Sequence, residues 1–120
     1  MIESFKLRAI ENFHSSEALF DLGYFNASAN RAYYAIFHCA LVELMKRCYK
    51  LPVDHRNVQS MFIKELINRR KIFSSQMKNN FVEAMELRND ADYKNGVTKT
   101  DAKKQVAKTG IFLKTIFKEF

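Results

Sequence analysis

Apolar residues recur at three- and four-residue steps along almost the whole chain, which is the period of an amphipathic α-helix. The first segment shows the pattern with Ile2, Phe5, Ala9, Phe13 and Phe20. Glycine is common just after helix ends because it enters the left-handed conformation without a Cβ penalty. The sequence therefore predicts a first helix that begins near Ile2 and stops at Gly23.

A second predicted helix runs from about Asn26 to Tyr49, with Asn26 or Ser28 as its N-cap. Its apolar stripe is the broadest in the chain and predicts a central, heavily buried element: Tyr33, Tyr34, Phe37, Leu41, Leu44, Met45 and Cys48. Cys39 and Cys48 stand about 13 Å apart at the helical rise, beyond disulfide reach. Both are predicted to be buried thiols, as expected in a reducing cytoplasm.

Three more helices follow from the same periodicity. The third spans about His55 to Asn68, after a loop closed by Pro52 and a cap at Asp54. The fourth covers about residues 75–92, and the fifth starts at a cap formed by Thr98 or Thr100 and continues to residue 120. With only three glycines and one proline, a many-stranded β fold and a glycine-rich phosphate loop are both excluded. The predicted fold is all-α, a five-helix up-and-down type bundle formed by one domain over residues 1–120.

The net positive charge of the chain suggests a negatively charged partner. The formal net charge is +7, and it is uneven: residues 1–60 carry seven basic and six acidic side chains, whereas residues 61–120 carry thirteen and seven. A basic half fits a polyanion such as RNA, although a lysine-rich solvated surface gives the same count. Eleven phenylalanines and five tyrosines exceed what so short a chain needs for a core, which favours a homodimer.

Polar residues inside apolar stripes are the first candidates for a site. Arg31 and His38 lie seven residues apart on the second helix, with Tyr34 between them on the same side. A buried arginine needs an acidic partner, and Asp92 is the first choice, with Asp90 next. The alternative is a satisfied interior hydrogen-bond network without a function of its own.

Residues 87–93, with the sequence LRNDADY, form a second cluster at the end of the fourth helix. Arg88 and Asn89 have the chemistry to position a phosphate group, because a guanidinium offers paired donors to phosphate oxygens. The same segment could instead be a helix end tied to Arg31 by Asp92. No catalytic triad and no metal-ligand spacing accompanies it, since His14, His38 and His55 lack close His, Cys or Asp partners. No metal and no cofactor is expected.

Four stretches together resemble the HEPN family, the small all-helical domains of prokaryotic toxin–antitoxin, CRISPR and RNA-processing systems. They are residues 22–25 (LGYF), 30–38 (NRAYYAIFH), 55–58 (HRNV) and 88–93 (RNDADY). Their order and spacing are similar to those of short, stand-alone HEPN proteins over nearly the whole chain.

The resemblance implies chemistry for the second cluster. HEPN ribonucleases carry an arginine, usually a polar residue after it, and a histidine four to six residues further on. Two such motifs face each other in a homodimer and cleave single-stranded RNA without metal. Arg88 and Asn89 match the start of the motif, whereas Tyr93 stands in the histidine position. A phenol is a far weaker general base than imidazole near neutral pH.

Three functions follow from the resemblance: a ribonuclease toxin that uses Arg88 and Tyr93, a silent HEPN module that binds RNA or a nucleotide, and a dimeric scaffold. The absent histidine favours the second. Similar short HEPN proteins often accompany a minimal nucleotidyltransferase, which in some cases modifies a tyrosine near the motif, and Tyr93 is the candidate here. Arg31 and His38 have the motif's spacing but lie in the wrong helix, so they are predicted to support the site.

The cellular setting is the last expectation. No stretch approaches the roughly 18 apolar residues that a membrane span needs. The first residues lack the apolar core of a signal peptide. A cytoplasmic protein that does not contact membranes is therefore predicted.

Overall fold

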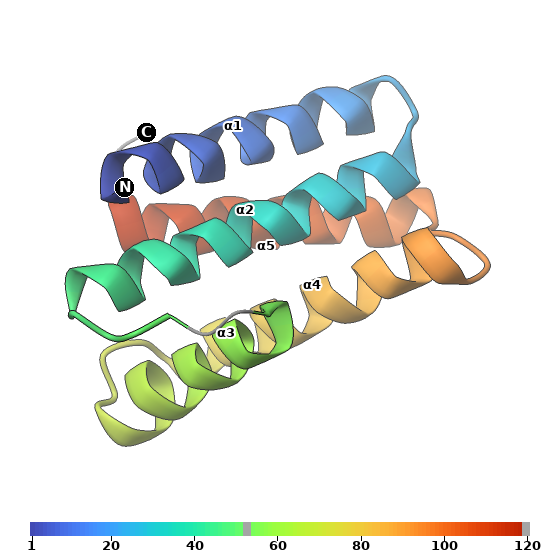
Figure 1. Ribbon diagram of the computed structural model, residues 1–120. Coiled ribbons are helices and arrows are strands. Elements are labelled where there is room, and N and C mark those ends of the chain that lie inside the picture. The colour runs from blue at the N-terminus through green and yellow to red at the C-terminus, as the bar shows by residue number, and fades with distance from the viewer. Residues whose placement is uncertain (52–53, 119–120) are drawn as a thin grey trace.

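The computed structural model describes residues 1–51 and 54–118, and in these ranges it is helical, with no strand (Figure 1). The elements are α1 (Ile2–Asp21), α2 (Phe25–Lys46), α3 (His55–Met61) continued directly by the π-helix η1 (Phe62–Arg69), α4 (Ser75–Tyr93) and α5 (Lys99–Phe117). With α3 and η1 taken as one helical segment, the predicted all-α fold of five helices is confirmed. The predicted loop residue Pro52 and the last predicted helical residue, Phe120, lie outside the described residues.

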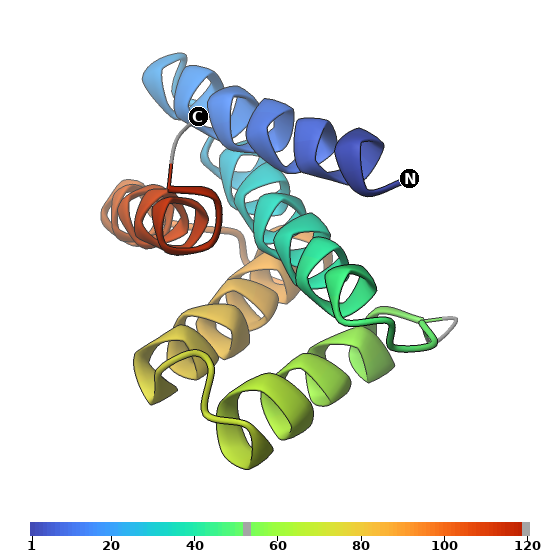
Figure 2. The ribbon, with the colours of Figure 1, turned by 90° about the vertical axis from the view of Figure 1, so that its left-hand side faces the viewer.

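Helix α2 is the centre of the fold. It packs against α1, α3, α4 and α5, and Figure 2 shows it running between α1 on one side and α4 on the other. Its residues from Ala35 to Leu44 are almost all buried. The broad apolar stripe of α2 therefore has the central position that the sequence predicts.

Aromatic rings fill the space where α2, η1, α4 and α5 meet. Phe62, Phe81 and Phe112 are fully buried, and their ring centroids lie 5.8 to 6.1 Å apart. Tyr33 of α2 reaches the same cluster, 6.4 Å from Phe81. Rings at these separations attract one another beyond the area that they bury. Much of the large aromatic content is therefore core, and it ties α4 to α2.

The end of α1 is a Schellman motif, which confirms the predicted stop at Gly23. The Tyr24 N–H donates to the Leu19 carbonyl and the Gly23 N–H donates to the Phe20 carbonyl, both at 2.9 Å. Gly23 has a φ of 84°, the left-handed conformation that this motif requires. The chain turns back at once and enters α2 at Phe25.

The predicted N-cap of α2 is wrong, because Tyr24 occupies that position and makes no side-chain cap bond. Ser28 lies inside the helix, where its hydroxyl donates to the Ser16 carbonyl at 2.7 Å and fastens α2 to α1. The Asn26 side-chain oxygen accepts from the Val97 N–H at 2.7 Å. Both side chains make tertiary bonds in place of the predicted cap, and Asn26 links the start of α2 to the loop before α5.

Helix starts elsewhere follow the sequence. The Asp54 carboxylate accepts from the Asn57 N–H at 2.9 Å and caps α3, and Thr98 accepts from the Asp101 N–H at 3.1 Å and caps α5. The third helix differs from the prediction in its second half, which winds as a π-helix to Arg69. There the Arg70 N–H bonds the Glu65 carbonyl, five residues back, as in a π turn.

The two cysteines have different environments. Cys39 is fully buried in α2, as predicted. The prediction is wrong for Cys48, which is exposed because α2 ends at Lys46 and Cys48 has a φ of 61° in the turn that follows. Burial, and to a smaller extent the Glu43 carboxylate, raises the pKa of the Cys39 thiol, so Cys39 stays protonated and unreactive.

We expect one of the two thiols to react quickly with Ellman's reagent at pH 8 in the folded protein, and the second to react only in denaturant. The thiolate is the reacting species, and the reagent can reach Cys48, which is exposed, but not Cys39, which is fully buried. A Cys48→Ser variant should show no fast reaction. Two fast equivalents in the native wild-type protein would contradict this assignment.

Candidate functional site

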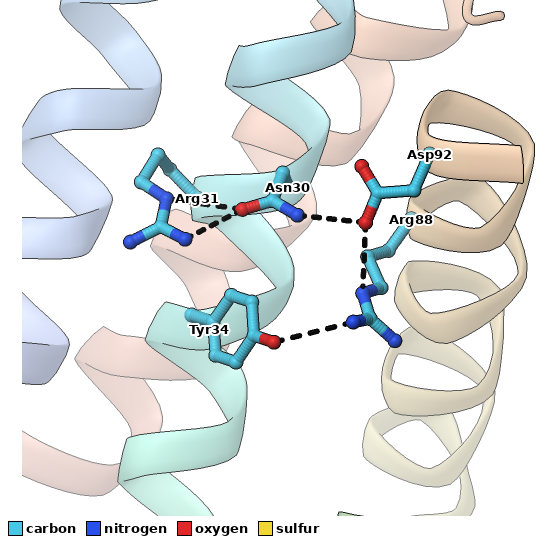
Figure 3. Close-up of polar contacts among 5 residues, drawn as sticks. All are labelled: Asn30, Arg31, Tyr34, Arg88 and Asp92. Atoms are coloured by element: carbon cyan, nitrogen blue, oxygen red, sulfur yellow. Dashed lines mark hydrogen bonds and ion pairs between the residues drawn. The ribbon is translucent and has the colours of Figure 1, made fainter.

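Five polar residues come together from two helices that face each other. Asn30, Arg31 and Tyr34 lie on α2, and Arg88 and Asp92 lie on α4 (Figure 3). Residues four apart stand one above the other on a helix, so each helix presents its side chains to the other as a short row. The site therefore exists because α2 and α4 pack together.

Arg88 is the most constrained side chain of this group. Its Nε lies 3.2 Å from Asp92 Oδ2 in an ion pair, and its Nη2 donates to the Tyr34 hydroxyl at 3.3 Å. The side chain is only 18% exposed and that of Asp92 is 29% exposed. A charge held this far from water needs a partner, and Asp92, one turn later on the same helix, supplies it.

Three tyrosine rings surround the Arg88 guanidinium. Its Cζ lies 5.5 Å from the ring centroid of Tyr33, 5.6 Å from that of Tyr34 and 6.0 Å from that of Tyr93. Each separation is within cation–π range. Burial raises the pKa of the Tyr33 phenol, and Arg88 lowers it by a smaller amount, so Tyr33 remains a neutral phenol. The rings fix the position of the guanidinium, and because they are neutral they do not cancel its positive charge.

The predicted ion pair between Arg31 and Asp92 is wrong. Asp92 pairs with Arg88, and Asn30 lies between Arg31 and Asp92 (Figure 3). The Asn30 amide nitrogen donates to Asp92 Oδ2 at 3.0 Å, and its oxygen accepts from Arg31 Nε at 3.1 Å. An amide can face both ways because it carries a donor and an acceptor. Asn30, which the sequence reasoning missed, lies four residues before Tyr34, and that spacing was the available signal.

His38 supports the joint between α1 and α2. Its ring stacks on Phe5 with the centroids 5.6 Å apart, and its Nδ1 lies 2.8 Å from the Tyr34 carbonyl oxygen. That short distance requires Nδ1 to carry the hydrogen, so the Asn12 amide nitrogen at 3.3 Å is a neighbour and does not donate to it. These contacts place His38 between α1 and α2 and next to Tyr34, and its supporting role stays a prediction.

Asp90 does not join this group. Its carboxylate lies 3.8 Å from Lys94 Nζ and lines a groove between α4 and α5 together with Asp101 and Lys104. The sequence places Asp90 second among the possible partners of Arg31. Asp90 cannot pair with Arg31, because residues two apart on a helix point in different directions, and it is Asp92 that faces α2.

An open groove of about 710 Å³ lies beside Arg88, between α4 and α3. Asn89 lies next to Arg88 on its wall, and the remaining lining residues are largely polar: Asp54, Asn57, Gln59, Ser60 and Met85. The sequence did not indicate the residues of α3, because their part in the groove depends on how α3 packs. Arg88 and Asn89, predicted to bind phosphate, share one accessible wall.

Tyr93 lies at the end of α4 and is 74% exposed. Its ring approaches Arg88 from the solvent side of the cluster. The structure therefore brings together the two residues predicted to carry the chemistry. In the part of the chain that is described, no group of three His, Cys, Asp or Glu residues could hold a metal ion, and no helix there is long and apolar enough to cross a membrane.

Comparison with known families decides what kind of domain this is. The family model described as HEPN domain matches residues 2–119. The chain belongs to the HEPN domain family. No curated protein matches the chain by sequence. Membership of the HEPN family confirms the resemblance seen in the four sequence stretches, and it covers both helices that form the Arg88 site.

The contacts of this HEPN domain predict which charges are coupled. A double-mutant cycle on Arg88→Met and Asp92→Asn should give a coupling energy of about 1 kcal/mol, because the two charges are in direct contact and partly shielded from water. The cycle on Arg31→Met and Asp92→Asn should give less than half of that, since Asn30 separates them. Urea unfolding followed by circular dichroism measures both. A larger coupling for Arg31 would restore the pairing predicted from the sequence.

Proposed function

We propose that this protein is a HEPN module of a prokaryotic toxin–antitoxin or RNA-processing system, and that it binds single-stranded RNA through Arg88 and Asn89. The observation that carries this proposal is that Arg88, whose guanidinium is fixed by Tyr34 and Asp92, is one of the residues that line an open groove. Arg88 has five N–H donors. Among the described residues its Nη2 bonds the Tyr34 hydroxyl and its Nε pairs with Asp92, which leaves Nη1 for a ligand. A positioned guanidinium can offer paired donors to a phosphate without first losing side-chain freedom.

Binding without cleavage fits the residues best. The sequence has tyrosine five residues after Arg88, and no histidine occurs after His55. Cleavage of RNA without metal needs a group that takes a proton from the ribose 2′-hydroxyl, and a neutral phenol does this poorly near pH 7. Arg88 and Asn89 can still hold a phosphate and a hydroxyl in the groove.

The charge of the chain supports a polyanionic ligand. Its net charge of +7 comes mostly from residues 61–120, the half that contains α4 and α5. Excess positive charge raises the rate at which a nucleic acid arrives, and it adds affinity that falls with salt.

Cleavage with Tyr93 is the second candidate. What favours it is the position of the Tyr93 ring, 6.0 Å from Arg88 Cζ and largely exposed, so that a substrate on Arg88 could touch the phenol. In this mechanism Arg88 would stabilise the charge that develops on the phosphate, and Tyr93 would donate a hydrogen bond or a proton.

We also propose a homodimer and a nucleotidyltransferase partner. In the homodimer, two copies of Arg88 and Tyr93 would lie near the two-fold axis and form one RNA-binding groove. Tyr93 would be the residue that the partner modifies, and its 74% exposure supports this, because an enzyme can reach the phenol. The family resemblance supports both proposals.

Arg88→Gln should weaken binding to a 12-nucleotide single-stranded RNA at least tenfold and reduce its salt dependence, because a phosphate contact is lost. Fluorescence anisotropy between 50 and 200 mM KCl measures the affinity. Arg69→Gln is the matched control, since it removes the same charge from an exposed arginine paired with Glu65 on η1. Equal affinities for wild type and Arg88→Gln would contradict the assigned role of Arg88.

Cleavage is measured separately, on the same RNA with EDTA present. Intact RNA after long incubation with wild type is the expected result. Fragments that disappear with both Arg88→Ala and Tyr93→Phe would select the nuclease function. If the wild-type protein neither binds nor cuts RNA at low salt, the dimeric scaffold is the remaining candidate function.

Light scattering should report a dimer of about twice 14.1 kDa at tens of micromolar. Tyr93→Glu should shift it toward monomer, because it would bring two like charges close together near the two-fold axis. A monomer over this concentration range would show that the two Arg88 sites act separately.

A further inference from the structure

Among the described residues, the side chains that bond the Arg31 guanidinium are neutral. Its Nε and Nη2 donate to Asn30 Oδ1 at 3.1 and 2.6 Å, and its Nη1 donates to Asn12 Oδ1 at 3.0 Å. Its Cζ lies 4.9 Å from the ring centroid of Tyr34. Contacts from α1 and α2 therefore fix the guanidinium on three sides.

The charge of Arg31 is not compensated. Three arginines whose side chains are described are partly buried. Arg47 contacts the Glu43 carboxylate and Arg88 contacts Asp92, whereas Arg31 makes no ion pair within the described residues. A partly buried cation without a carboxylate costs free energy. The protein keeps this charge in one fixed orientation, which is what an anion-binding residue requires.

Arg31 also has donors to spare. Of the five N–H groups of a guanidinium, three are used in its hydrogen bonds, and the remaining two belong to the terminal nitrogens. A phosphate oxygen can accept from such groups in charge-assisted bonds.

Tyr34 places this second cation beside the first. The Tyr34 ring lies under Arg31 at 4.9 Å, and its hydroxyl accepts from Arg88. Figure 3 shows the two guanidinium groups flanking Tyr34, with Asp92 on the Arg88 side only. The cluster contains two arginines and one carboxylate, that of Asp92, so it retains a positive charge.

We propose that Arg31 is a second phosphate-binding residue, which holds a backbone phosphate of single-stranded RNA next to the one that Arg88 binds. The strand would cross α2 from the groove beside α4 toward α1. The choice of RNA rests on the proposed function, whereas the anion site itself rests on the contacts of Arg31.

The salt dependence of RNA binding tests this directly. For single strands, the slope of log K against log salt changes by about 0.7 for each phosphate contact. Arg31→Gln should therefore reduce the slope by about 0.7 and weaken binding several-fold, while the exposed, carboxylate-paired control Arg69→Gln changes neither. Arg31→Lys should keep most of the slope, because it retains the charge. A folded Arg31→Gln protein with the wild-type slope would overturn the proposal.

A second measurement separates this site from the proposed function. The side-chain Nε–H signals of Arg31 and Arg88 can be followed by NMR during titration with inorganic pyrophosphate, with Arg31→Gln used for assignment. A shift of the Arg31 signal is expected. If Arg31 responds but RNA does not bind, the RNA function fails and the anion site stands.

The opposite results are equally informative. If Arg88 responds and Arg31 does not, the proposed function stands and the Arg31 site fails. If neither responds and RNA does not bind, both fail. Displacement of RNA by an acidic peptide at equal charge concentration would instead assign Arg31 to a protein partner and would overturn the RNA proposal for this residue.

Discussion

The placement of the Arg88 charge between α2 and α4 is the constraint on which the site depends. A guanidinium that is mostly shielded from water has to be neutralised and oriented at once, and here Asp92 does the first while the Tyr34 hydroxyl and three aromatic rings do the second. This fixes how α4 lies against α2. The groove beside α3 and the exposed position of Tyr93 both follow from that packing.

The helices could be predicted from the sequence because burial imposes a period, and burial of one helix face is a local property of the chain. Gly23, Asp54 and Thr98 could be predicted for the same reason, since helix ends are decided within a few residues. The predicted cap of α2 was wrong because Asn26 and Ser28 form tertiary bonds instead, to Val97 and Ser16. No local rule reveals a competition of that kind.

In the site, too, features set by neighbouring residues could be predicted, whereas those set by tertiary packing could not. Arg88, Asn89 and Tyr93 can be proposed from the sequence because they lie close together in it, and Arg31 stands out as a charge on an apolar helix. The predicted partner Asp92 is wrong, and the alternative of an interior hydrogen-bond network agrees with the structure, in which the Asn30 amide bonds both Arg31 and Asp92. The π-helix η1 and the polar wall that α3 adds to the groove depend on packing, which periodicity does not describe.

The end of α4 has a consequence for any molecule that approaches Tyr93. Tyr93 is the last residue of the helix. The chain beyond it turns through Gly96, whose φ is 94°, and Val97 is then bonded to Asn26. A Cβ at residue 96 would lie 3.2 Å from the Asn26 amide, so the turn has little room to rearrange. The phenol therefore stands where a helix ends and the chain turns back to α2, so a molecule that binds it meets a folded corner rather than an extended peptide.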